Sequence, residues 1–169
     1  MTAKTHALGG FLLHKQRFSL DNAPMEHPSP MLYALPMIYL IGGAPRVGKS
    51  ILAANISQAI GVTPLSTDTL CGAFKKTLPP EEALLRFPLP GFSGDPAQNT
   101  LTPAERVELQ LTSARSLQGP IEHTIAEALH QGKDLVIEGV HVLPEQVRAL
   151  IDTHGAEHFR SLFVGLTSA

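Results

Sequence analysis

The sequence predicts an α/β protein in which helices cover both faces of a parallel sheet. Two short runs, Met37–Ile41 and Leu135–Ile137, are apolar throughout, which is typical of strands buried on both faces. A further strand is expected at Phe159–Leu166, after a helix that begins at Pro144 and ends near His154. Because strands that alternate with helices form right-handed βαβ units, this order favours one parallel sheet.

The first helix is expected soon after the first strand. The stretch Lys49–Ile60 places Leu52, Ile56 and Ala59 on one face, and Gly61 follows as a C-terminal cap. This spacing predicts a helix that packs one apolar face against the sheet.

The middle of the chain is less regular. A second strand is expected at Val62–Thr67, although Pro64 weakens it, and Asp68 is suited to cap the helix that follows. The segment at about 79–101 is rich in proline and glycine, so we expect an irregular insert with no more than a turn around Glu81–Arg86.

A long helix is predicted to begin after this insert. Thr102 is a capping residue, Pro103 suits the first helical position, and Glu105 completes a capping box. The pair Gly119-Pro120 is expected to break or kink this helix before it resumes.

The chain has 169 residues, enough for one domain and a tail. Residues 1–36 contain several prolines and no apolar periodicity, so we expect a loosely ordered tail before a domain at 37–169. Basic residues precede the first acid, as in a targeting peptide, but no apolar core with a cleavage site accompanies them.

Composition narrows the functional classes. A net charge of −2 provides no electrostatic footprint for nucleic acid. No apolar run approaches the ~20 residues that a membrane helix needs. The single cysteine, Cys71, cannot form an internal disulfide, which fits a reducing compartment and predicts a cytoplasmic protein.

The segment that follows the first strand matches the phosphate-binding motif G-x-x-x-x-G-K-[ST] at every position. Glycines let successive backbone N–H groups turn inward around phosphate oxygens, and the start of the next helix adds its positive end. In this motif the lysine reaches the outer phosphates and the serine hydroxyl binds Mg²⁺. The residues expected to bind the nucleotide are Gly43, Ala44, Pro45, Arg46, Val47, Gly48, Lys49 and Ser50.

Two carboxylates are expected beside this loop. Glu138 ends an apolar strand, where it would hold Mg²⁺ together with Ser50; the alternative is a simple acid at a strand end. Asp68 follows the second strand and would accept the proton of an attacking hydroxyl; the alternative is a helix cap. Ligands gather at the carboxyl ends of strands in open α/β sheets, which favours a site containing both.

Three segments together resemble the small-molecule kinase branch of the P-loop NTPase fold, and 2-phosphoglycerate kinase above all. They are Ile38–Leu52, Thr63–Leu70 and Leu135–Pro144, the last of which reads Leu-Val-Ile-Glu-Gly-Val-His-Val-Leu-Pro. The chain is also similar, more broadly, to zeta-toxin and chloramphenicol-phosphotransferase-like kinases. The resemblance spans about residues 37–166, without the insert.

The resemblance implies phosphoryl transfer from ATP, with Mg²⁺, to a hydroxyl of a small and phosphorylated metabolite. It assigns Lys49, Asp68 and Glu138 to catalysis, with Asp68 as base or acceptor orienter. It also implies a three-layer fold with strand order 2-3-1-4-5. The sequence stops beside the fourth strand, so we expect the order 2-3-1-4 with the fifth strand missing. The apolar edge at 159–166 would then favour self-association.

Three functional readings remain open at this stage. The intact motif residues favour a kinase. The absence of an arginine-bearing lid after Glu138, where only Arg148 and Arg160 are basic, favours a nucleotide-binding remnant or regulatory module without turnover. A GTPase-like switch is disfavoured because no N-K-x-D guanine signature is present.

Overall fold

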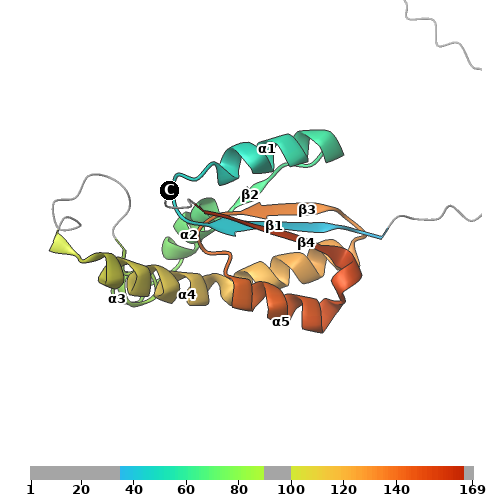
Figure 1. Cartoon of the computed structure of the whole chain (residues 1–169). Helices are drawn as coiled ribbons and strands as arrows, with labels where there is room; N and C mark the ends of the chain where they lie inside the picture. The colour runs from blue at the N-terminus through green and yellow to red at the C-terminus, as the bar shows by residue number, and fades with distance from the viewer. Residues whose placement is uncertain (1–34, 90–99, 166–169) are drawn as a thin grey trace, which may run out of the picture. The chain divides into compact units, whose positions relative to one another are not determined.

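The computed structural model describes residues 35–89 and 100–165, which form a parallel sheet between two layers of helices (Figure 1). The strands lie in the order β2-β3-β1-β4, and every neighbouring pair is parallel. The α/β fold and the strand order predicted from the sequence are therefore confirmed. The expected tail lies almost entirely outside the described residues. The strands are β1 (Ile38–Gly43), β2 (Leu65–Ser66), β3 (Leu135–Glu138) and β4 (Phe159–Val164).

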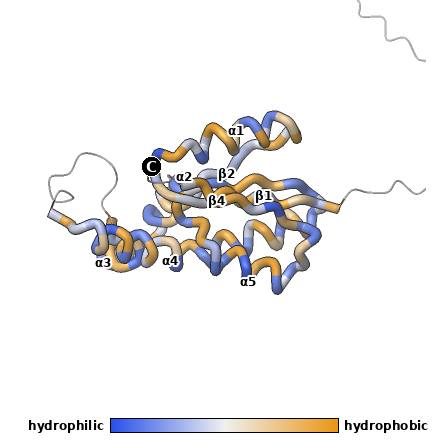
Figure 2. The backbone as a smooth tube through the Cα atoms, viewed as in Figure 1, coloured by the Kyte–Doolittle hydropathy of each residue, from blue (hydrophilic) through white to orange (hydrophobic). Residues whose placement is uncertain are grey.

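The two faces of the sheet bury different side chains because successive residues of a strand point to opposite sides. On one face, Ile38 and Leu40 of β1 join a core with the helices α4 and α5. On the other face, Ile41 and Val136 pack with Ala53 of α1. Figure 2 shows hydrophobic residues along the strands between the helical layers. The helices are α1 (Lys49–Ile60), α2 (Thr67–Lys75), α3 (Pro80–Arg86), α4 (Pro103–His130) and α5 (Pro144–His154), with a short 3-10 helix η2 (Ala156–His158).

Two expectations for the middle of the chain were wrong in extent. The second strand is only two residues long, since Val62 to Pro64 lie before it and Thr67 already belongs to α2. The insert is not irregular throughout, because α3 forms at its start with proline at the first position and acids in the first turn. Phe87, directly after α3, is 2% exposed and meets Phe74 edge to face, so the helix is fixed by its buried end.

Of the break or kink expected at Gly119-Pro120, the break is wrong, because α4 runs through both residues as one helix. Leu117 and Ile121 are both buried in the core, so tertiary packing holds the helix on either side of the proline. The Pro120 carbonyl also accepts a hydrogen bond from the hydroxyl of Thr124 at 2.8 Å. No helix among the described residues is both long and apolar enough to cross a membrane.

The start of β1 is tied to the segments around it. The Met37 N–H donates to Asp134 Oδ1 at 2.8 Å, and the Pro36 carbonyl lies 3.0 Å from His158 Nδ1. Pro36 thus takes part in the fold, one residue before the domain start expected from the sequence.

Candidate active site

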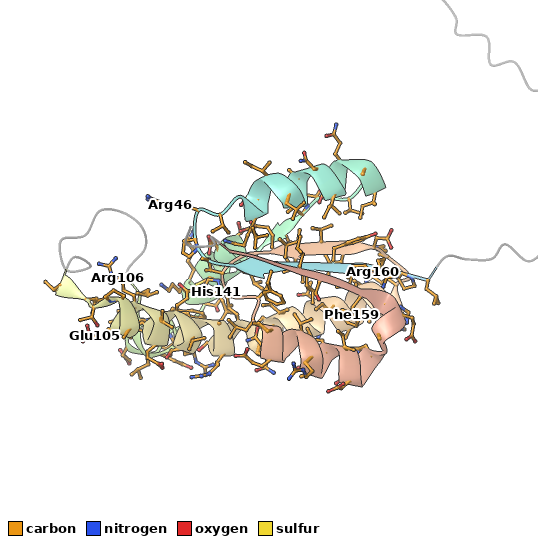
Figure 3. All side chains as sticks on the ribbon, in the orientation of Figure 1. Arg46, Glu105, Arg106, His141, Phe159 and Arg160 are labelled. Carbon is orange, nitrogen blue, oxygen red and sulfur yellow. The ribbon has the colours of Figure 1, made fainter. Side chains whose placement is uncertain are left out.

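The loop between β1 and α1 has the backbone turns that a phosphate-binding loop needs. Arg46 has φ +62° and Gly48 has φ +93°, both in the left-handed region. Such residues turn neighbouring N–H groups toward one side of a loop, where they form a concave anion site. Gly48 is also the N-cap of α1, so the positive end of that helix adjoins the loop. Figure 3 shows the Arg46 side chain at this turn, directed away from the sheet.

Lys49 and Ser50 open α1 directly after the loop. The Lys49 side chain is 6% exposed, and its ammonium donates to the Ala44 carbonyl at 2.6 Å. This hydrogen bond joins the two ends of the loop and keeps the Lys49 ammonium next to the loop backbone. Ser50 is exposed in the first turn, so its hydroxyl is accessible to a ligand at the loop.

Glu138 lies at the carboxyl end of β3, next to the strand that leads into the loop. Its register partners are Ile41 in β1 and Ser66 in β2. The residue is 7% exposed, and no group in the described ranges donates a hydrogen bond to its carboxylate. Its carboxylate oxygens are not among the buried side-chain atoms that lack a partner, so they keep contact with solvent at the strand end, where a cation can approach. Because Mg²⁺ binds through oxygen ligands and one or two carboxylates, the donor set of Ser50 and Glu138 fits this ion.

Asp68 is not the helix cap, so that alternative reading was wrong. Ser66 is the N-cap of α2, and its hydroxyl accepts a hydrogen bond from the Asp68 N–H at 3.3 Å. The Asp68 carboxylate stands in the first turn with 67% of its side chain exposed. Ser66 therefore caps the helix, and the Asp68 carboxylate is left available for another role.

A buried contact joins the turn after β3 to the start of α2. Thr67 Oγ1 and His141 Nδ1 lie 3.0 Å apart, and Thr67 is fully buried. The contact depends on Gly139, which has φ +148° and whose missing Cβ would collide with the Thr67 hydroxyl. His141 Nδ1 is also 3.7 Å from Asp68 Oδ1.

The environment of His141 favours its neutral form. Burial lowers the pKa of His141 below its ordinary value, the Asp68 carboxylate opposes this shift, and the Lys75 charge adds to it. With a neutral imidazole, His141 and Asp68 do not form an ion pair. Within the described residues, no lysine or arginine forms a salt bridge with the Asp68 carboxylate.

A cavity of about 670 Å³ opens beside Asp68 and His141. It lies between α2, the first half of α4 and the turn after β3, and it reaches Pro45 of the phosphate-binding loop. A smaller cavity of about 100 Å³ between α4 and α5 is remote from these residues. The larger cavity is lined by Pro45, Asp68, Cys71, Gly72, Lys75, Leu89, Leu101, Arg106, Val107, Gln110, Ser113, Val140 and His141.

The parallel sheet thus brings the sequence-predicted residues to one edge. The loop follows β1, Glu138 ends β3, and Asp68 follows β2, while β3 lies between the other two strands. Sequence reasoning missed Arg106 and Gln110 of α4, which line the cavity from a helix about 40 positions further along the chain. Their one available signal was the capping box at Thr102, which fixes where α4 begins but not what it faces.

Comparison with known proteins supports the resemblance. No protein-family model matches the chain. A mevalonate-3-phosphate 5-kinase of Thermoplasma acidophilum is 26% identical over 117 residues, which cover 68% of this chain and 55% of that protein. A 2-phosphoglycerate kinase of Methanothermobacter thermautotrophicus is 30% identical over 117 residues, or 67% of this chain and 38% of that protein. Another, from Pyrococcus horikoshii, is 26% identical over 115 residues, with coverage of 68% and 38%.

These matches span only about a third to a half of the relatives' own length. They nonetheless confirm the resemblance predicted from the sequence. Over about two thirds of its length, the chain is similar to kinases that are named for phosphorylated small metabolites.

Proposed function

We propose that the protein transfers the terminal phosphoryl group of ATP to a hydroxyl of a small, phosphorylated metabolite. The observation that carries the proposal is the meeting of three groups at one sheet edge: the loop with Lys49, the buried Glu138 and the exposed Asp68. The cavity beside them provides room for an acceptor. The similarity to kinases of 2-phosphoglycerate and mevalonate 3-phosphate agrees with this chemistry.

In the proposed reaction the chain positions both substrates and stabilises charge. The loop N–H groups and Lys49 bind the phosphates, and Ser50 and Glu138 would hold Mg²⁺, which would supply charge neutralisation at the phosphates. The acceptor oxygen forms a bond to the terminal phosphorus while the bond from phosphorus to the bridging oxygen breaks and ADP leaves. Asp68 takes the proton of the acceptor hydroxyl.

The alternative function is nucleotide binding without turnover. Its support is the placement of Arg148 and Arg160, two arginines described after Glu138. Neither lines the cavity, and an Arg160 N–H donates to the Phe159 carbonyl instead. An arginine that stabilises the transferring phosphoryl group can contribute about 10³–10⁵ in rate.

A coupled assay separates the two functions. The full chain with Mg-ATP is tested against a panel of phosphorylated hydroxy acids and sugar phosphates, while calorimetry measures nucleotide affinity. Transfer to a panel member supports the kinase, and tight nucleotide binding without transfer to any of them supports the alternative. Lys49→Ala should abolish nucleotide binding; unchanged affinity in that variant would contradict both functions.

A further inference from the structure

We propose that the 670 Å³ cavity is the acceptor site and that it binds the acceptor's phosphate at Lys75 and Arg106, with the hydroxyl directed at Asp68. The placement of the hydroxyl at Asp68 rests on the proposed function. The binding of the phosphate does not depend on turnover, so it can be tested in a protein that transfers no phosphoryl group.

The cavity is bounded by one face of each of two helices. The residues of α2 that line the cavity lie three, four and seven positions after the first of them, so they share one side of the helix. They are Asp68, Cys71, Gly72 and Lys75. The cavity-lining residues Arg106, Gln110 and Ser113 of α4 follow the same spacing, four and seven positions from the first. The cavity is therefore a groove lined by one face of each helix.

The groove has opposite charges at its two ends along α2. Asp68 stands at the start of the helix, beside the phosphate-binding loop, and Lys75 stands two turns later, about 10 Å away along the axis. The Lys75 ammonium donates to the Leu89 carbonyl at 3.3 Å and lies 5.6 Å from the centre of the Phe87 ring. No acidic side chain in the described ranges forms a salt bridge with it.

Residues of α4 add to the cationic end. Arg106 lines the cavity near the beginning of α4, well apart from His141 in Figure 3. Gln110 Nε2 is buried and finds no acceptor within the described residues. A phosphate oxygen in the cavity could accept from this amide, and phosphate forms charge-assisted bonds with lysine and arginine.

The dimensions restrict the class of acceptor. The hydroxyl and the phosphate must lie within the reach of Asp68 and of the flexible Lys75 side chain, so a short carbon chain suffices to join them. The remaining walls are largely apolar. The groove thus has room for a small phosphorylated hydroxy compound. The apolar lining comes from Leu89, Leu101, Val107 and Val140.

Gly72 provides a direct way to close the groove. It lies within α2, and a Cβ added there would meet no heavy atom within 4 Å. A larger side chain at this position would enter the free space of the cavity without a backbone clash. Gly119 of α4 is equally open but does not line the cavity, so it is the matched control.

The test is calorimetry on the full chain, with 2-phosphoglycerate as the probe and a non-hydrolysable ATP analogue as the nucleotide. Lys75→Ala should weaken probe binding about tenfold or more, while Lys76→Ala, outside the cavity, should not. Arg106→Ala should weaken it similarly, in contrast to Arg115→Ala. Gly72→Leu should abolish probe binding and Gly119→Leu should retain it.

Each variant is expected to keep the nucleotide affinity of the wild type, which also reports that it is folded. Glycerate, which lacks the phosphate, should bind the wild type more weakly and should not respond to Lys75→Ala. The inference is overturned if the wild type binds nucleotide but not the probe, or if Gly72→Leu and Lys75→Ala bind it as the wild type does. Probe binding that depends on Lys75, in a chain that binds no nucleotide, would retain the inference and reject the proposed function.

Discussion

At the scale of single residues, substitutions of Ser66 and Asp68 should have different effects, one on stability and the other on phosphoryl transfer. Ser66 caps α2, so the exposed Asp68 side chain contributes only the interaction of its charge with the helix start. Asp68→Asn should therefore lower the free energy of unfolding by no more than about 1 kcal/mol and leave the nucleotide affinity nearly unchanged. If Asp68 is the base, phosphoryl transfer should fall by about 10²–10⁴-fold.

Ser66→Ala provides the reciprocal control. It removes the cap and should lower the free energy of unfolding by about 0.5–2 kcal/mol, while transfer per folded molecule persists. Urea denaturation and the coupled assay measure the two effects. Turnover retained in Asp68→Asn would rule out the base role.

The buried imidazole of His141 predicts a dependence of stability on pH. Burial lowers its pKa in the folded state relative to the ordinary value of 6.5, so the unfolded chain binds this proton more readily. The free energy of unfolding should therefore fall as the pH drops below 6.5 and through the lowered pKa. The Asp68 carboxylate limits the effect, and the Lys75 charge strengthens it.

Urea midpoints at pH 7.5 and pH 5.5 measure this dependence. His141→Asn removes the titrating group and should show a smaller difference between the two pH values than the wild type. An equal difference in both proteins would mean that other groups are responsible.

At the scale of elements, α4 holds a proline that costs it stability. Pro120 lacks an N–H and so cannot donate to the turn before it, yet packing of Leu117 and Ile121 keeps the helix continuous. Pro120→Ala should restore this bond and raise the free energy of unfolding by about 1–3 kcal/mol. Urea denaturation measures the gain, and Gly119→Ala, with an expected gain of at most about 1 kcal/mol, is the comparison. A loss of stability in Pro120→Ala would indicate that packing requires a local bend.

The same helix explains what the sequence could predict of this fold. Local signals sufficed for β1, β3, α1 and the start of α4, because apolar runs and capping residues act within a few positions. Continuity through Pro120 depends on contacts with the core, which no local pattern reports. The site divides in the same way: the loop and Glu138 follow from motif and strand, whereas Arg106 and Gln110 reach the cavity only through tertiary packing.

At the scale of the whole molecule, β4 is expected to govern association. Within the described residues it pairs only with β1, and Leu162 and Phe163 are 50% and 38% exposed. An apolar edge strand is a template for pairing with another chain, so we expect the protein to form dimers or larger species. Sedimentation velocity should show this, and Leu162→Lys should shift the distribution toward the monomer.

Leu85→Lys is the control, because Leu85 is 76% exposed on α3, away from the edge of the sheet. If both lysine variants dissociate the protein equally, surface hydrophobicity in general is the cause. A monomeric wild type would contradict the expectation.

The anchoring of Pro36 and Met37 also fixes where an attachment meets the protein. Both are bonded at the entry to β1, whereas the phosphate-binding loop leaves its exit, six residues and about 20 Å away. A tether joined ahead of residue 35 thus reaches the sheet at the end opposite the proposed nucleotide site. Immobilising the chain on a sensor surface through that end should leave ligand access open, and affinities measured on the surface should equal those in solution.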